Sequence, residues 1–213
     1  HPASHLERIK RASPEQGVVH LDPDTAMNPH TWQAALRAAG AGCHAVDLVM
    51  SGECENAFCA VRPPGHHAEK ANPMGFCFFN NIGVAARHAL KKHGLERVAI
   101  IDFDVHHGNG TEDCFAGDDQ VLMCSIFQHP FYPYCGTEKP AANMCNVPLA
   151  AGCGGEEFRD AVLQVWTPRL KEFKPQMIFI SAGFDGHYED DMGGLKLLEK
   201  DYAWCTEHLK NLA

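Results

Sequence analysis

The sequence of 213 residues contains no apolar run that approaches the roughly 18 residues of a transmembrane helix. It also has no excess of positive charge, because 18 Lys and Arg stand against 27 Asp and Glu, a formal net charge of −9. Binding to nucleic acid or to an acidic membrane by charge alone is therefore not expected. The N-terminus lacks a basic and then apolar signal pattern. Without a repeat or a Gly/Ser-rich linker, the chain is predicted to be one domain over 1–213.

The ten cysteines are scattered, and no two of them have C-x-x-C spacing. Cys59, Cys77 and Cys124 lie inside apolar runs, so we interpret the cysteines as buried thiols rather than as a disulfide framework. This interpretation predicts a reducing compartment, the cytoplasm, or the nucleus in a eukaryote. Fourteen histidines are the more unusual feature, since several stand beside aspartates.

Continuous apolar runs, without alternation, predict strands that are buried on both faces of a parallel sheet. Such runs cover residues 98–101, 121–126 and 177–182, with a shorter one at 57–61. Helical patterns cover 31–50, 81–93, 156–173 and 200–212, with Thr31 as an N-cap, Gly94 ending the second helix and Pro168 kinking the third. Residues 1–30 are predicted to be irregular, with a turn at 22–25. This alternation predicts an α/β fold with a mainly parallel sheet flanked by helices.

Each apolar run leads directly into polar residues, where the ligand site of an open α/β sheet is expected. Residues two apart on an extended segment point the same way, so Asp104 and His106 can bind one cation. Asp185, at another strand end, can supply a third ligand. Two carboxylates and one imidazole suit a zinc-type ion with a position open for water. The alternative is a solvated loop whose histidines are satisfied, but the recurrence at separate strand ends favours a metal.

The remaining histidines differ in their prospects. One of the adjacent pair His66–His67 can act as a general base, with Asp102 and Asn109 available to fix the ring tautomers. His107 is a candidate for supporting a metal ligand, and His187 is left open. Isolated histidines are interpreted as surface or helix residues, for example His20, His88, His93 and His208.

Four motifs, in this order, resemble the zinc-dependent histone deacetylases. They are R-P-P-G-H-H-A (62–68), G-F-C-F-F-N (75–80), D-x-D-V-H-H-G-N-G-T (102–111) and S-A-G-F-D (181–185). The amino-acid sequences of these motifs most resemble those of class II and of the bacterial histone-deacetylase-like amidohydrolases of the arginase/deacetylase superfamily. The resemblance implies the three-layer arginase/deacetylase fold. It also implies zinc-dependent hydrolysis of acetyl-lysine amides in proteins.

The resemblance implies a role for each matching position. Asp104, His106 and Asp185 would hold zinc. His67 would be the general base and acid, with His66 as its electrostatic partner, Asp102 beside His66 and Asn109 beside His67. The substrate tunnel would be formed by Gly75, Phe76 and Tyr132, with Asp24 at its rim. A structural potassium ion would lie near Asp102, Asp104, His106, Ser125 and Ile126, and a second, weaker one near Phe115 and Val121.

The sequence also departs from the family pattern. It contains no Gly-Gly-Tyr segment, from which the family supplies an electrophile for the oxyanion. We therefore expect that N- and C-terminal parts of the domain are missing and that a sheet edge is exposed. We also expect weak or absent deacetylation by a chain of this length, although it binds zinc.

Other functions remain open at this point. The partners expected are acetylated lysine side chains or small acetylated amines, without nucleic acid or membrane, and oligomerisation is left open. An acetylpolyamine amidohydrolase is the alternative within the same chemistry, since the negative charge would favour a cationic polyamine. An arginase-like site with two metals is less favoured, because only one ligand set is visible. A non-catalytic module that binds acyl-lysine is the alternative from a different class.

Overall fold

The computed structural model describes residues 1–213, which divide into two compact units. Unit 1 comprises His1–Leu95 and Asn109–Cys114, and unit 2 comprises Glu96–Gly108 and Phe115–Ala213. None of the helices combines the length and apolar character that crossing a membrane requires. The expectation of one domain over 1–213 stays a prediction.

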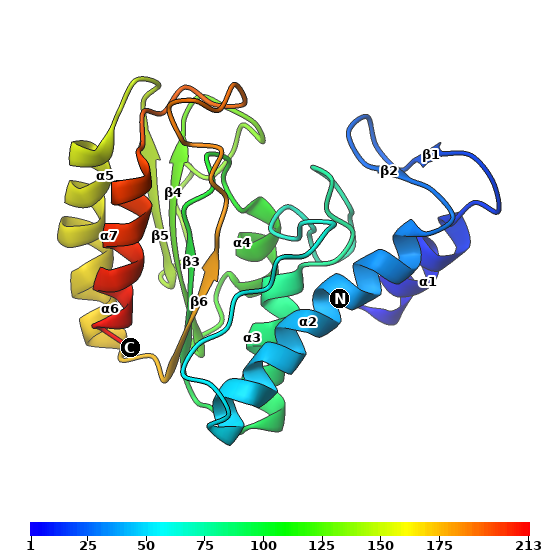
Figure 1. Ribbon diagram of the computed structural model, residues 1–213, viewed down its shortest axis with the longest axis horizontal. Coiled ribbons are helices and arrows are strands. Elements are labelled where there is room, and N and C mark those ends of the chain that lie inside the picture. Colours follow the sequence, from blue (N-terminus) through cyan, green and yellow to red (C-terminus); the bar gives the residue numbers. More distant parts are fainter. The chain divides into compact units, whose positions relative to one another are not determined.

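Unit 2 is built on a four-stranded parallel sheet in the order β5-β4-β3-β6 (Figure 1). All residues of β3 and β4 are buried, as their continuous apolar runs predict. Asp102, the last residue of β3, lies beside Ser125 of β4 and Ser181 of β6, so the carboxyl ends of these strands are aligned. The strands are β3 (Val98–Asp102), β4 (Val121–Gln128), β5 (Met144–Leu149) and β6 (Met177–Ser181).

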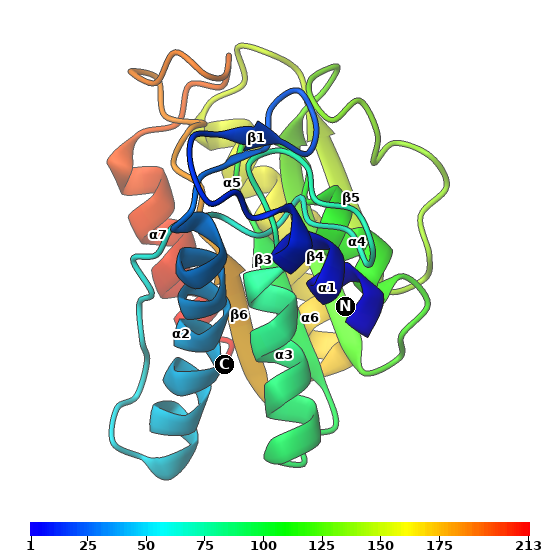
Figure 2. The ribbon, with the colours of Figure 1, turned by 90° about the vertical axis from the view of Figure 1, so that its right-hand side faces the viewer.

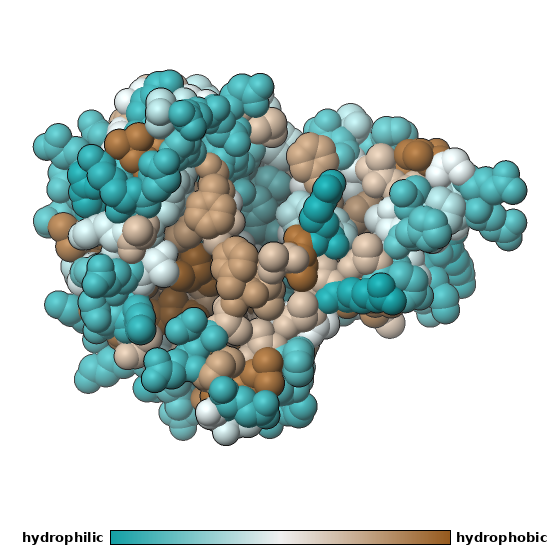
Figure 3. Space-filling view, in the orientation of Figure 1, coloured by the Kyte–Doolittle hydropathy of each residue, from teal (hydrophilic) through white to brown (hydrophobic).

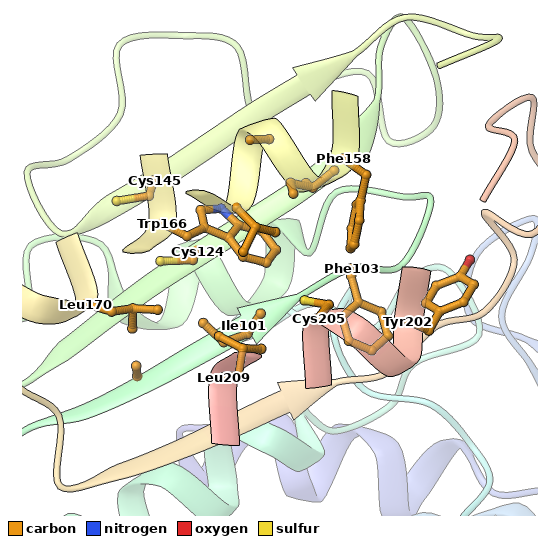
Figure 4. Close-up of a cluster of buried hydrophobic side chains, with 14 of the residues drawn as sticks. Ile101, Phe103, Cys124, Cys145, Phe158, Trp166, Leu170, Tyr202, Cys205 and Leu209 are labelled. Atoms are coloured by element: carbon orange, nitrogen blue, oxygen red, sulfur yellow. The ribbon is translucent and has the colours of Figure 1, made fainter. Parts of the chain in front are cut away.

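The main hydrophobic core of unit 2 lies between this sheet and a layer of helices (Figure 4). Trp166 and Phe158 from the helices are fully buried, as is Ile101 from the sheet. The helical layer consists of α5 (Gly155–Ala161), a π-helical turn (Val162–Trp166), α6 (Thr167–Phe173) and α7 (Glu199–Lys210). These segments confirm the helices predicted at 156–173 and 200–212. Pro168 lies in the first turn of α6, where its missing N–H is not needed, and the π-helical turn is the irregularity in this run.

Strand β6 forms one edge of the sheet. All five of its residues are partly exposed. On the face drawn in Figure 3, hydrophobic side chains gather over this strand.

Unit 1 consists mainly of helices, with one short antiparallel pair of strands. Its elements are α1 (Ala3–Ala12), β1 (Val19–His20), β2 (Ala26–Met27), α2 (Thr31–Ser51), α3 (Asn81–Lys92) and most of α4 (Asn109–Phe115). The turn predicted at 22–25 joins β1 to β2, with Asp22 Oδ1 accepting hydrogen bonds from the main chain of Asp24 and Thr25. Helix α3 begins where the Asn80 side chain accepts from Gly83 N, and Gly94 follows its end with φ +70°.

Four predictions about local structure were wrong. Residues 57–61 form no strand; they are exposed and pair with no other strand, and Cys59 is exposed with them, although Cys77 and Cys124 are buried as predicted. Residues 3–12 are helical rather than irregular, because His5 and Ile9 recur one turn apart and are buried while most of the other residues are exposed. Thr31 is the first residue of α2 and not its N-cap, which is His30.

The cysteines were interpreted as thiols rather than as a disulfide framework, and none of the ten forms a disulfide.

Candidate functional site

The structure brings the three predicted metal ligands of unit 2 together. Asp104 and His106 follow β3, Asp185 follows β6, and their candidate ligand atoms all lie within 4.8 Å of one another. His106 Nδ1 is 2.9 Å from Asp104 Oδ1 and 3.0 Å from Asp185 Oδ2. The three side chains are 11–20% exposed, so the group is shielded but reachable from solvent.

Main-chain contacts hold the two carboxylates in place. His106 N donates to Asp104 Oδ1 at 2.8 Å, and Val105 N donates to Asp185 Oδ1 at 2.9 Å. A Cβ atom on Gly183 would overlap the Asp104 carboxylate. Gly183 is therefore a residue of the site that the sequence reasoning did not single out, although it lies inside the S-A-G-F-D motif.

The electrostatics of this group favour a cation. Burial alone would lower the pKa of His106, but hydrogen bonds to Asp104 and Asp185 and their negative charges outweigh burial and raise it to about 9. A positive charge between these carboxylates is thus stabilised, whether it is a proton or a metal ion. Two carboxylate oxygens and one imidazole nitrogen fit a catalytic zinc ion, which needs three protein ligands and an open position.

Aromatic side chains border His106. The Phe131 ring is stacked on the imidazole with a centroid distance of 5.0 Å, and the Tyr132 ring meets it edge-on at 6.1 Å. Tyr132 was predicted as part of the substrate tunnel. Phe131 is the closer neighbour of the imidazole.

The residues predicted to bind the first potassium ion lie at the same end of the sheet. Asp102, Ser125 and Ile126 are buried. Asp102 Oδ1 accepts a hydrogen bond from Asp104 N at 3.2 Å, and Ser125 Oγ lies 3.2 Å from Nδ1 of His107. His107 therefore contacts a residue of the predicted potassium site.

The second predicted potassium site has a different geometry. The main-chain carbonyls of Phe115, Asp118 and Val121 accept hydrogen bonds from the Asn143 side-chain amide at 2.8, 3.0 and 2.8 Å. Carbonyl oxygens thus converge there, as a potassium ion would require. In this structure they accept hydrogen bonds from the Asn143 amide instead.

The histidine pair lies in unit 1 and is buried. The ring centroids of His66 and His67 are 4.0 Å apart, and His67 Nδ1 is 2.7 Å from Asn109 Oδ1. Asn109 Nδ2 donates to Glu69 Oε1 at 3.0 Å, which fixes the orientation of the amide. The proton of His67 is therefore on Nδ1 and its lone pair on Nε2, the tautomer that a general base needs. Glu69 was missed from sequence, although it stands only two residues after His67.

Of the tunnel residues predicted in unit 1, Gly75 lies against this pair. Gly75 has φ +55°, and a Cβ atom there would collide with the His67 ring. Phe76 is 54% exposed, and its N–H donates to Thr25 Oγ1 at 3.2 Å. Asp24 lies on the exposed β1–β2 turn.

His187, which the sequence left open, is not a member of the metal group. Its Nδ1 accepts a hydrogen bond from Glu189 N at 3.3 Å, and its Nε2 is 3.6 Å from Glu199.

Comparison with known proteins agrees with this fold. Residues 1–213 match the family model of the histone deacetylase domain. The chain is 38% identical to the histone deacetylase-like amidohydrolase of Pseudomonas aeruginosa over 220 residues, covering 100% of this chain and 58% of that protein. It is 36% identical to the polyamine deacetylase HDAC10 of Rattus norvegicus, covering 97% of this chain and 36% of that protein.

A solved structure extends the likeness to three dimensions. The crystal structure of the HDA15 HD domain superposes with a TM-score of 0.94 at 34% identity, covering 100% of this chain and 64% of that one. The chain belongs to the histone deacetylase family. The predicted fold class and the resemblance stated from the sequence motifs are both confirmed.

Proposed function

We propose that this chain hydrolyses the amide bond of acetylated lysine side chains with a zinc ion held by Asp104, His106 and Asp185. The observation that carries the proposal is the convergence of two carboxylates and one imidazole at the carboxyl ends of β3 and β6. When bound, zinc would polarise the acetyl carbonyl and lower the pKa of a water toward about 7. Membership of the histone deacetylase family supports a deacetylase activity. The zinc ion and the acetyl-lysine substrate are part of our proposal.

In the proposed reaction, His67 takes a proton from the attacking water at Nε2 and returns one to the leaving lysine amine. Asn109 and Glu69 support this role, because their hydrogen bonds keep the proton of His67 on Nδ1. His66, with Asp102 as its acceptor, tunes the charge of the pair. Gly75, Phe76 and Tyr132 contact the aliphatic stem of the substrate, and Asp24 accepts a hydrogen bond from its main chain.

Potassium has a structural role in this proposal. The first ion would be held by Asp102, Asp104, His106, Ser125 and Ile126, partly through main-chain carbonyls. Phe115 and Val121 would contribute carbonyls to the second, where the Asn143 amide now donates hydrogen bonds to them.

The first test is hydrolysis of a fluorogenic acetyl-lysine peptide by the protein with added zinc, with a chelator, and with Asp185→Asn. Asp190→Asn is the matched control, because Asp190 also accepts a main-chain hydrogen bond, from Met192 N at 2.8 Å, but lies outside the metal group. We expect turnover that requires zinc, is lost in Asp185→Asn and persists in Asp190→Asn. Zinc binding that depends on Asp185 without any turnover would contradict the proposal and favour a binding module.

A second substrate class is favoured by two observations, the net charge of −9 and the similarity to a polyamine deacetylase. The same assay with an N-acetylated polyamine in place of the peptide compares the two classes directly. A higher kcat/KM for the polyamine would move the assignment to that substrate and leave the metal chemistry unchanged.

A further inference from the structure

A second group of metal-binding side chains lies in unit 1, where α2 and α3 end. Asp47 is on α2, His88 is on α3, and His93 is the C-cap of α3. His88 Nε2 and His93 Nε2 lie 2.8 and 2.7 Å from the same oxygen, Asp47 Oδ1, and the candidate ligand atoms are within 4.8 Å of one another. The proposed deacetylase reaction uses none of these three residues.

The packing of the two helices explains why these residues meet. Helices α2 and α3 run side by side in the same direction (Figure 2). They approach closely at Gly42, where a Cβ atom would lie 2.9 Å from Ala85 Cβ. Both C-terminal ends therefore lie near Asp47. The partial negative charge of two helix C-termini adds to that of the carboxylate, so this corner of the unit favours a cation.

We propose that Asp47, His88 and His93 bind a divalent transition-metal ion of the zinc class. Two imidazole nitrogens and one carboxylate oxygen form a donor set that suits Zn²⁺, Co²⁺ or Cu²⁺ better than Mg²⁺ or Ca²⁺. At the usual zinc–nitrogen distance, the ligand atoms of a tetrahedral site are about 3.3 Å apart. The present nitrogen–oxygen separations need to open by only about half an ångström to reach that geometry. Side chains that are 21% and 36% exposed leave a route to solvent and room for a water ligand.

Lys92 competes with the metal in this site. Its Nζ lies 3.1 Å from Asp47 Oδ2, and its side chain is 57% exposed, so it can turn into solvent. Hydrogen bonds from His88, His93 and Lys92 hold the pKa of the Asp47 carboxyl well below its usual range. The carboxylate is thus charged in ordinary buffers, the form in which it can bind a metal ion.

Metal stoichiometry tests the proposal without any measurement of activity. Metal-free, tag-free protein is titrated with Co²⁺, and binding is followed by visible absorption and by calorimetry. We expect two equivalents, one of which is lost in Asp185→Asn. The double variant His88→Gln/His93→Gln keeps amide donors for Asp47 but no imidazole, and is expected to lose the other equivalent. His44→Gln is the matched control, because His44 is an exposed histidine of α2, the helix that carries Asp47. This variant is expected to keep both equivalents.

Lys92→Met provides a second, independent readout. Removing an ammonium group that lies this close to a divalent ion is expected to tighten the second equivalent by about tenfold, even with water-like screening. A double histidine variant that binds as many equivalents as the unchanged protein would overturn the proposal, whether that number is one or two. Unchanged affinity in Lys92→Met would also overturn it, and this holds even if the double variant fails to fold. Because the readout is binding, loss of the proposed deacetylase function would leave this result unaffected.

Discussion

Two replacements of Asp185 separate its charge from its structural hydrogen bond. Asparagine keeps an oxygen that accepts from Val105 N, whereas alanine leaves that N–H without its partner. Val105 is fully buried, so losing the acceptor costs about 1–3 kcal/mol. For a chain of this size that corresponds to a melting temperature roughly 3–9 °C lower for Asp185→Ala than for Asp185→Asn in the metal-free state.

Metal binding, in contrast, should fail in both variants. Changes outside the ligand shell already cost 10- to 100-fold in metal affinity, so losing a charged ligand should cost at least about 100-fold. Thermal unfolding in chelator gives the first comparison, and titration with zinc against a chromophoric chelator gives the second. Wild-type zinc affinity in Asp185→Asn would refute Asp185 as a ligand. Equal melting temperatures for the two variants would refute the structural role of its bond to Val105.

Three further predictions follow from the same geometry. Gly183→Ala places a methyl group against the Asp104 carboxylate, so zinc affinity should fall by about 10- to 100-fold while the circular dichroism spectrum is retained; unchanged affinity contradicts this. Gly75→Ala strains a left-handed residue and pushes the His67 ring, so kcat should fall by up to about 100-fold with zinc affinity unchanged; a loss of zinc instead would contradict the separation of roles. Burial raises the pKa of the Cys205 thiol to about 12, above its value of about 8.5 in the unfolded chain. The stability that this burial contributes is therefore fully present below about pH 8.5 and declines as the pH rises, by about 2 kcal/mol at pH 10. Denaturant unfolding between pH 8 and 10 should show a shallower decline for Cys205→Ala, and parallel declines would contradict it.

The sequence was most informative where one physical signal dominated. Continuous apolar runs predicted β3 and β4, because a strand buried on both faces has no polar side to display. The same pattern predicted the strand β6, but not its exposure, because β6 lies at the edge of the sheet and is partly exposed. The helical pattern and the Gly94 that follows it placed α3 within one residue. The run 57–61 had the same apolar character, but it has no neighbouring strand with which to pair, and pairing is a property of the tertiary structure.

Helix α1 shows the opposite failure. Its composition is polar, and only His5 and Ile9 turn inward, so too few apolar positions were available to reveal the period. Strand β5 was not predicted either, since it lies at the sheet edge and is only partly buried.

The sequence by itself determined the family, the α/β fold and the group Asp104, His106 and Asp185. Strand ends and two-residue spacing are local features, and parallel strands bring their carboxyl ends together in every sheet of this kind. Only the tertiary structure decided that His88 and His93 share one oxygen of Asp47, because their spacing along the chain carries no metal signature. Both histidines are more than 40 positions from Asp47 in the sequence. The packing of the two helices brings them within hydrogen-bonding distance of it.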